Sequence, residues 1–292
     1  VGKGQRLRKR LAQGRQHSVW ETFGFSGALV HACASMAATA VLETAGAAGA
    51  RAVSTRLLGV WRLTAGLRVE LHITPDVVEC PPAGRCDALV NPANEQLVGT
   101  KLPYFPMRDT DPPPGLRHSG WCGMEVGQHM FYPAQVVDGR VHALGGREML
   151  EEIQRLPEVA PGVRCRIGGA VVTRATGELA RNFGAIVHTV PPMYEAAGWA
   201  SALAGCYGAS LRAARGRSLR VLACPLLGAG ARGAPVEEAA LVAAEALADV
   251  ANGGADTDDP LGVTFRLAVR EDSVAESVAY GLRQVLGSSE AR

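Results

Sequence analysis

Segments typical of β-strands alternate with segments typical of helices from residue 67 to residue 286. The stretch LRVELHIT alternates strictly between apolar and polar residues from Leu67 to Thr74, which predicts a half-buried strand. CDALVNPA follows as a continuous apolar run of the kind found inside a sheet that is covered on both faces. Further strand patterns lie at residues 169–173, 185–190, 219–227 and 263–269.

Helical patterns separate these strands. Pro235 suits the first position of a helix because its φ is fixed, and Ser273 with Glu276 has the spacing of a capping box. Strands that alternate with helices predict an α/β fold, here a three-layer α/β sandwich. The helical patterns lie at about 147–156, about 195–214, from Pro235 to about Asp249 and from Ser273 to about Leu286.

Residues 1–57 are predicted to form a basic and Ala-rich helical extension before a main domain over residues 58–292. Residues 1–20 hold six basic side chains and no acidic one, whereas the rest of the chain holds 24 basic and 28 acidic residues. The Ala-rich stretch 28–50 is interrupted by polar residues, so it predicts a packed helix and no membrane span. The basic arm is a solvated terminus, an organelle-targeting segment or a polyanion-binding arm. Its basic residues are Lys3, Arg6, Arg8, Lys9, Arg10 and Arg15.

The cysteines and histidines do not have the spacing of a metal site. The seven cysteines are scattered without a CxxC pair, which argues against zinc and against a disulfide framework and indicates a reducing compartment. His188 lies within the strand pattern AIVHTV and is predicted to be a core histidine. The sequence therefore predicts no metal and no cofactor. The other histidines considered are His118, His129 and His142.

Two loops carry residues suited to binding a nucleotide. In DALVNPAN an apolar strand ends in Asn91 and Asn94, whose amides offer donors and acceptors. In LLGAGARGAP, Gly228, Gly230 and Gly233 spell GxGxxG before a helix, so backbone N–H groups can converge on an anion. A dinucleotide fingerprint is not supported, because the acid expected about twenty residues later would fall inside that helix. Asparagine-type turns and a tight strand-to-helix turn are the alternatives for these loops.

Both loops follow strands of the predicted sheet. In open α/β sheets, ligands bind beyond the carboxyl ends of the strands. Amides can bind ribose hydroxyls, and converging N–H groups can bind a diphosphate. Together the two loops predict a site for a nucleotide sugar.

The chain resembles the macrodomain family from about Leu67 to about Leu286. Five blocks in the family's order carry the resemblance: DALVNPANEQLVG, VVDGRVHALGGREMLEEI, EVAPGVRCRIGGAVVT, AIVHTVPP and ACPLLGAGARGAPVEEAA. The resemblance implies a three-layer α/β/α sandwich with a mixed, mostly parallel central sheet. It also implies a fold that binds ADP-ribose and that, in some branches, hydrolyses ADP-ribose conjugates. It implies that Asn94, near Asn91, lies beside the distal ribose, and that Asp138 is the acid that helps to activate water in hydrolase branches. The implied diphosphate loop comprises Gly228, Ala229, Gly230, Ala231, Arg232 and Gly233.

The chain also departs from the family pattern. His72 stands where the family has an Asp for the adenine amine, and Tyr132-Pro-Ala-Gln-Val-Val137 replaces a glycine run before the acid. Arg140 replaces a small residue two places after the acid. An irregular insertion over residues 99–136, rich in proline, glycine and aromatic residues, enters between Asn94 and Asp138 and is predicted to be ordered. Its candidate lid residues are Trp121, Phe131 and Tyr132.

A second basic cluster lies in LRAARGRSLR. Cations at a helix C-terminus are ordinary partners of the helix dipole, but together with the basic arm they could bind a phosphate backbone. The cluster consists of Arg212, Arg215, Arg217 and Arg220.

Two functions follow from these features. The departures and the basic arm favour a non-catalytic structural or binding subunit of a larger organellar assembly. A mitochondrial ribonucleoprotein such as the ribosome would hold it through RNA or protein, and its ADP-ribose cleft would be retained or vestigial. Another organelle or the cytoplasm is the alternative location. The alternative function is an ADP-ribosyl hydrolase that uses Asn94 and Asp138.

Overall fold

The computed structural model of the chain describes residues 55–63, 66–100, 133–194, 196–253 and 262–289. All of them belong to one compact unit, Val53–Arg292. The basic arm, the Ala-rich stretch 28–50 and residues 101–132 of the insertion lie outside the described residues. The division into an extension over 1–57 and a domain over 58–292 therefore stays a prediction.

Seven strands form one mixed sheet in the order β1-β2-β7-β6-β3-β5-β4. The outer pairs, β1 with β2 and β4 with β5, are antiparallel, and the other neighbours are parallel. The predicted mixed, mostly parallel sheet is thus confirmed. The strands are β1 (Arg56–Arg62), β2 (Leu67–Ile73), β3 (Cys86–Pro92), β4 (Ala170–Arg174), β5 (Phe183–Thr189), β6 (Val221–Pro225) and β7 (Val263–Val269).

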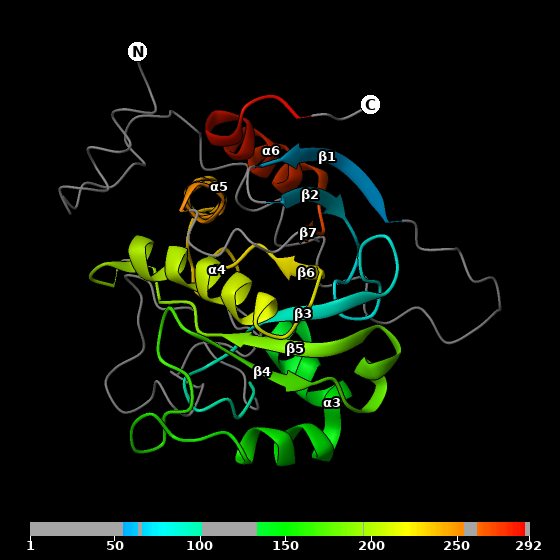
Figure 1. Cartoon of the computed structure of the whole chain (residues 1–292), viewed down its shortest axis with the longest axis vertical. Helices are drawn as coiled ribbons and strands as arrows, with labels where there is room; N and C mark the ends of the chain where they lie inside the picture. The colour runs from blue at the N-terminus through cyan, green and yellow to red at the C-terminus, as the bar shows by residue number, and fades with distance from the viewer. Residues whose placement is uncertain (1–54, 64–65, 101–132, 195, 254–261, 290–292) are drawn as a thin grey trace, which may run out of the picture. The chain divides into compact units, whose positions relative to one another are not determined.

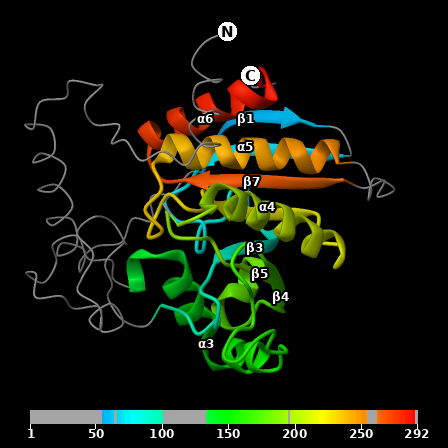
Figure 2. The same ribbon diagram turned by 90° about the vertical axis from the view of Figure 1, so that its left-hand side faces the viewer.

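Helices cover both faces of the sheet, which confirms the three layers. Successive residues of β3 point to opposite faces: Val90 packs in the cluster that contains the α4, α5 and α6 side chains, and Leu89 packs in the cluster that contains those of α3. Figures 1 and 2 show α4, α5 and α6 lying next to one another. No helix in the described part of the chain is long and apolar enough to cross a membrane. The helical elements are η2 (Pro133–Gln135), α3 (Val137–Gln154), η3 (Gly177–Arg181), α4 (Trp199–Arg215), α5 (Val236–Asn252) and α6 (Asp272–Leu286).

The first half of α3 was not predicted. The helical pattern was placed at about 147–156, but α3 begins at Val137 and contains a break at Gly146, whose φ of 64° and ψ of −158° are not helical. Glycines at 139, 145 and 146 lower the intrinsic helix propensity of this half. Burial of Val141 in the core stabilises it instead. This half matters because it carries Asp138.

Strand β1 was not predicted, and two smaller predictions of the fold were wrong. Strand β2 is buried on both faces, so it is not half-buried, and Glu70 and His72 are only 6% and 2% exposed. The capping box does not form, because α6 begins at Asp272, which places Ser273 within the first turn, and its N-cap Glu271 makes no side-chain capping bond.

Candidate functional site

Three loops meet beyond the carboxyl ends of β3, β5 and β6. The guanidinium of Arg232, in the glycine loop after β6, donates a hydrogen bond of 2.9 Å to the Ala93 carbonyl after β3. The Arg232 carbonyl accepts one of 2.9 Å from the Tyr194 N–H after β5. The structure therefore brings the end of β3, with Asn91 and Asn94, and the glycine loop, residues 228–233, to one edge of the sheet.

Asp138 and Asn91 are buried at this edge and hydrogen-bond to each other. Asp138 lies in the first turn of α3 and is 4% exposed, and a carboxylate is favourable at that end of a helix. Its Oδ1 accepts a hydrogen bond of 2.9 Å from Nδ2 of Asn91, and its Oδ2 accepts one of 3.0 Å from the Thr100 hydroxyl. His142 lies one turn further along α3, with Nε2 3.6 Å from Oδ1 of Asp138.

His188 is a third buried polar residue, and it contacts Asn91. It is fully buried, Nδ1 lies 3.2 Å from Nδ2 of Asn91, and Nε2 lies 2.9 Å from the Thr173 hydroxyl. Burial, with a smaller contribution from nearby His142, lowers the pKa of His188 to about 3, so the ring is neutral. The prediction of a core histidine is confirmed.

Asn94 uses its amide within its own loop. Its Oδ1 accepts the Val98 N–H at 3.2 Å, and its Nδ2 donates to the Gly99 carbonyl at 3.4 Å. Gly99 has a φ of 77°, and a Cβ there would lie only 2.5 Å from Cγ of His142, so only glycine permits this close approach. The loop thus folds over His142 and, through Thr100, over Asp138. The implied contact of Asn94 with a ribose stays a prediction.

The glycine loop presents unpaired backbone donors. Its closing bonds run from Gly233 N–H to the Gly230 carbonyl and from Ala234 N–H to the Gly228 carbonyl. Within the part of the chain that the structure describes, the N–H groups of residues 229–231 donate no hydrogen bond. A Cβ added at Gly230 would meet nothing within 4 Å, so the loop opens to free space there. An anion is a suitable partner for unpaired backbone N–H groups in a glycine loop.

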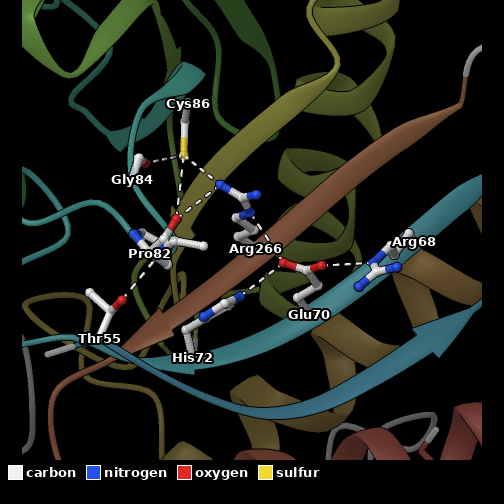
Figure 3. Close-up of polar contacts among 9 residues, drawn as sticks. Thr55, Arg68, Glu70, His72, Pro82, Gly84, Cys86 and Arg266 are labelled. Carbon is white, nitrogen blue, oxygen red and sulfur yellow. Dashed lines mark hydrogen bonds and ion pairs between the residues drawn. The ribbon is translucent and has the colours of Figure 1, made fainter. Parts of the chain in front are cut away.

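His72 belongs to a buried cluster of polar and charged side chains around Glu70. Figure 3 shows Arg68, His72 and Arg266 converging on the Glu70 carboxylate, with contacts of 2.7, 2.9 and 3.1 Å. Burial lowers the pKa of His72, although the bond to Glu70 opposes this. Burial raises the pKa of Glu70, but the bonds from His72 and Arg68 outweigh it, so the pKa is lowered. Sequence reasoning missed Glu70 and Arg266, because they come from strands far apart in the chain.

The remaining predicted site residues either lie outside the described residues or lie at the opposite edge of the sheet. The lid residues Trp121, Phe131 and Tyr132 and the basic residues of the arm lie outside the described residues. The second basic cluster lies at the opposite edge, because the N–H groups of Arg220 and Val221 bond to the Asp87 carboxylate near the start of β3. In the described ranges, no group of three His, Cys, Asp or Glu could hold a metal ion, and the five cysteines present are free.

Known proteins share this sequence pattern and fold. Residues 121–243 match the family model described as Macro domain. A macro domain-containing protein of Ralstonia nicotianae is 34% identical over 185 residues, which cover 63% of this chain and 81% of that protein. A macro domain-containing protein of Xanthomonas campestris is 38% identical over 109 residues, which cover 37% of this chain and only 59% of that protein.

Solved structures share the fold at lower identity. A macrodomain of Oceanobacillus iheyensis with ADP has a TM-score of 0.55 and 17% identity, over 79% of this chain and 96% of that chain. A variant of the same macrodomain was solved with ADPR, with a TM-score of 0.54 and 18% identity over 79% of this chain and 98% of that chain. At this identity the likeness concerns the fold.

The charge cluster around Glu70 makes stability depend on pH. Because the pKa of Glu70 is lowered from its ordinary 4.5, its contribution is complete above that value and is lost as the pH falls through the folded-state pKa. We expect Glu70→Gln, which leaves Arg68 and Arg266 without their shared carboxylate, to lower the free energy of unfolding by about 1.5–3 kcal/mol at pH 7.

Urea unfolding at a series of pH values checks this expectation. The difference from the wild-type protein should close as the pH falls below about 4.5. Glu148→Gln, which changes an exposed carboxylate of α3, is the matched control and should differ from wild type by less than about 0.5 kcal/mol. An undiminished difference at pH 3 would contradict the assigned role of Glu70.

Proposed function

The chain belongs to the macro domain family, and from this premise we propose that it binds ADP-ribose, or an ADP-ribosyl group carried by another molecule, where β3, β5 and β6 end. The glycine loop is the observation that carries this proposal. It offers backbone N–H groups without partners in the described structure beside the open space at Gly230. A diphosphate supplies the acceptor oxygens and the negative charge that such donors lack.

The other walls of the site suit the rest of the ligand. The Arg232 guanidinium, fixed to the Ala93 carbonyl, adds positive charge beside the glycine loop. Asp138 keeps free lone pairs after its bonds to Asn91 and Thr100, so it can accept a hydrogen bond from a ribose hydroxyl. The same fold holds ADP in a structure of the Oceanobacillus iheyensis macrodomain.

Blocking the glycine loop tests the binding function. Gly230→Val adds a side chain where the structure has open space and no left-handed φ, so the fold should tolerate it while the ligand loses its room. We expect this variant to weaken ADP-ribose binding by about tenfold or more, measured by titration calorimetry. Gly216→Val is the matched control, because Gly216 lies at the end of α4 on the opposite edge and a Cβ there makes only ordinary contacts. Absence of heat with wild-type protein at millimolar ADP-ribose would refute the proposal.

Hydrolysis of an ADP-ribosyl bond is the second candidate function, favoured by the setting of Asp138. The carboxylate is buried and fixed by two donors, and His142 lies 3.6 Å away on the next turn of α3. A carboxylate held this way can orient and activate a water molecule if the substrate brings its scissile bond within reach.

Release of ADP-ribose from a protein modified on acidic side chains tests the second function. Asp138→Ala should lower the rate at saturating substrate by about 100-fold or more, because the base is gone. Glu148→Gln, an exposed change on the same helix, should keep the wild-type rate. No release by the wild-type protein would exclude this substrate class and leave binding as the function.

A role in an organellar assembly such as a mitochondrial ribonucleoprotein is a further proposal, motivated by the six basic residues of the arm. Its support is the charge of residues 1–20, which could bind RNA through phosphates. Deletion of residues 1–20 should then weaken co-sedimentation with such particles and flatten its salt dependence, and unchanged co-sedimentation would refute it.

A further inference from the structure

Four polar side chains from four different elements form one hydrogen-bonded chain beneath the candidate site. Thr173 of β4 bonds to His188 of β5 at 2.9 Å, and His188 bonds to Asn91 of β3 at 3.2 Å. Asn91 in turn bonds to Asp138 of α3 at 2.9 Å. All four residues are buried, the most exposed of them only 4%. Hydrogen bonds between buried side chains act in a low local dielectric, and here each of them orients the group that it joins.

The donors in this chain can be assigned from its end at Asp138. A carboxylate only accepts, so Asn91 must direct its NH₂ group toward Asp138. The same NH₂ group supplies the donor for His188, so Nδ1 of the neutral ring is the acceptor. The proton of the ring is then on Nε2, which donates to the Thr173 hydroxyl. Each bond in the chain thus fixes the direction of the next.

The amide of Asn91 depends on these two bonds for its orientation. Its Oδ1 is buried and has no hydrogen-bond partner among the described residues. Among the described residues, nothing on the oxygen side holds the amide. If the acceptor on His188 is lost, only the bond to Asp138 still orients the amide, so the carboxylate loses a partner whose own position is fixed.

We infer that His188 is a positioning residue, which acts through Asn91 to hold the Asp138 carboxylate in the orientation that receives the ligand. This role rests on the proposed binding of ADP-ribose at this edge. His188 itself is 0% exposed, so it does not contact a ligand. Its partner Thr173 extends the same role by one bond, because its hydroxyl accepts the Nε2–H of the ring and so holds the ring in place.

A double-mutant cycle with ADP-ribose affinity as the readout tests this role. We expect His188→Leu to weaken binding by about tenfold, and Thr173→Val, which keeps the shape of the side chain, by about threefold. Asn in place of His188 keeps an acceptor near the position of Nδ1, so His188→Asn should restore binding to within about threefold of wild type. Asp138→Ala alone should also weaken binding by about tenfold, because the positioned carboxylate is lost.

The decisive comparison is made in the Asp138→Ala background. If His188 acts through the carboxylate, adding His188→Leu or Thr173→Val there should cause almost no further loss. Additive losses, no effect of Asp138→Ala, or a His188→Asn variant as weak as His188→Leu would each overturn the inference. Ser210→Ala, which removes a buried hydroxyl of α4 that has no hydrogen-bond partner among the described residues, controls for a general change in the core.

The outcomes separate this inference from the function on which it rests. Wild-type protein that does not bind ADP-ribose would defeat both. Wild-type protein that binds ADP-ribose while His188→Leu and Thr173→Val bind equally well would defeat the positioning role alone. If His188→Leu does not fold, the isosteric Thr173→Val variant still decides the question through its coupling to Asp138.

Discussion

The hydrogen bond from the Asn91 amide to the Asp138 carboxylate is the contact on which the candidate site depends. It joins the end of the central strand β3 to the first turn of α3, on the face of the sheet that α3 covers. A buried carboxylate is costly unless it is hydrogen-bonded, so the strand and the helix are held at the separation that satisfies this bond. The loops of the site are then fixed relative to that pair, through Thr100 on one side and Arg232 on the other.

The chain stabilises its two buried carboxylates differently. Glu70 contacts two guanidinium groups, whose positive charges neutralise its own, and it also bonds to His72. Asp138 receives an amide, a hydroxyl and the positive end of a helix, which hold its geometry without pairing it to an arginine. Glu70 is therefore suited to holding strands together, whereas Asp138 joins the end of β3 to the start of α3. His72 lies near the end of β2 but bonds to Glu70, so it stabilises the fold.

Local patterns were enough to predict most of the sheet. The strand at residues 263–269 has the predicted bounds, and β2 and β3 follow from alternation and from a continuous apolar run. The Glu70–Arg266 pair could not be predicted, because its members are 196 residues apart and each has the polar period of a surface position. The asparagines show the same limit. The sequence predicts that Asn91 and Asn94 lie at one strand end, but only the structure shows that Asn91 bonds to Asp138 and that Asn94 bonds within its own loop.

The strand order also determines when the site can form during folding. Strand β2 pairs with β7, and β3 lies between β5 and β6, so no described strand that neighbours β3 is close to it in the chain. Closing such long loops costs chain entropy before the contacts repay it, which slows folding. During synthesis, β3 must therefore wait until β5 and β6 have been made before it is paired on both sides, and β2 must wait longer still for β7.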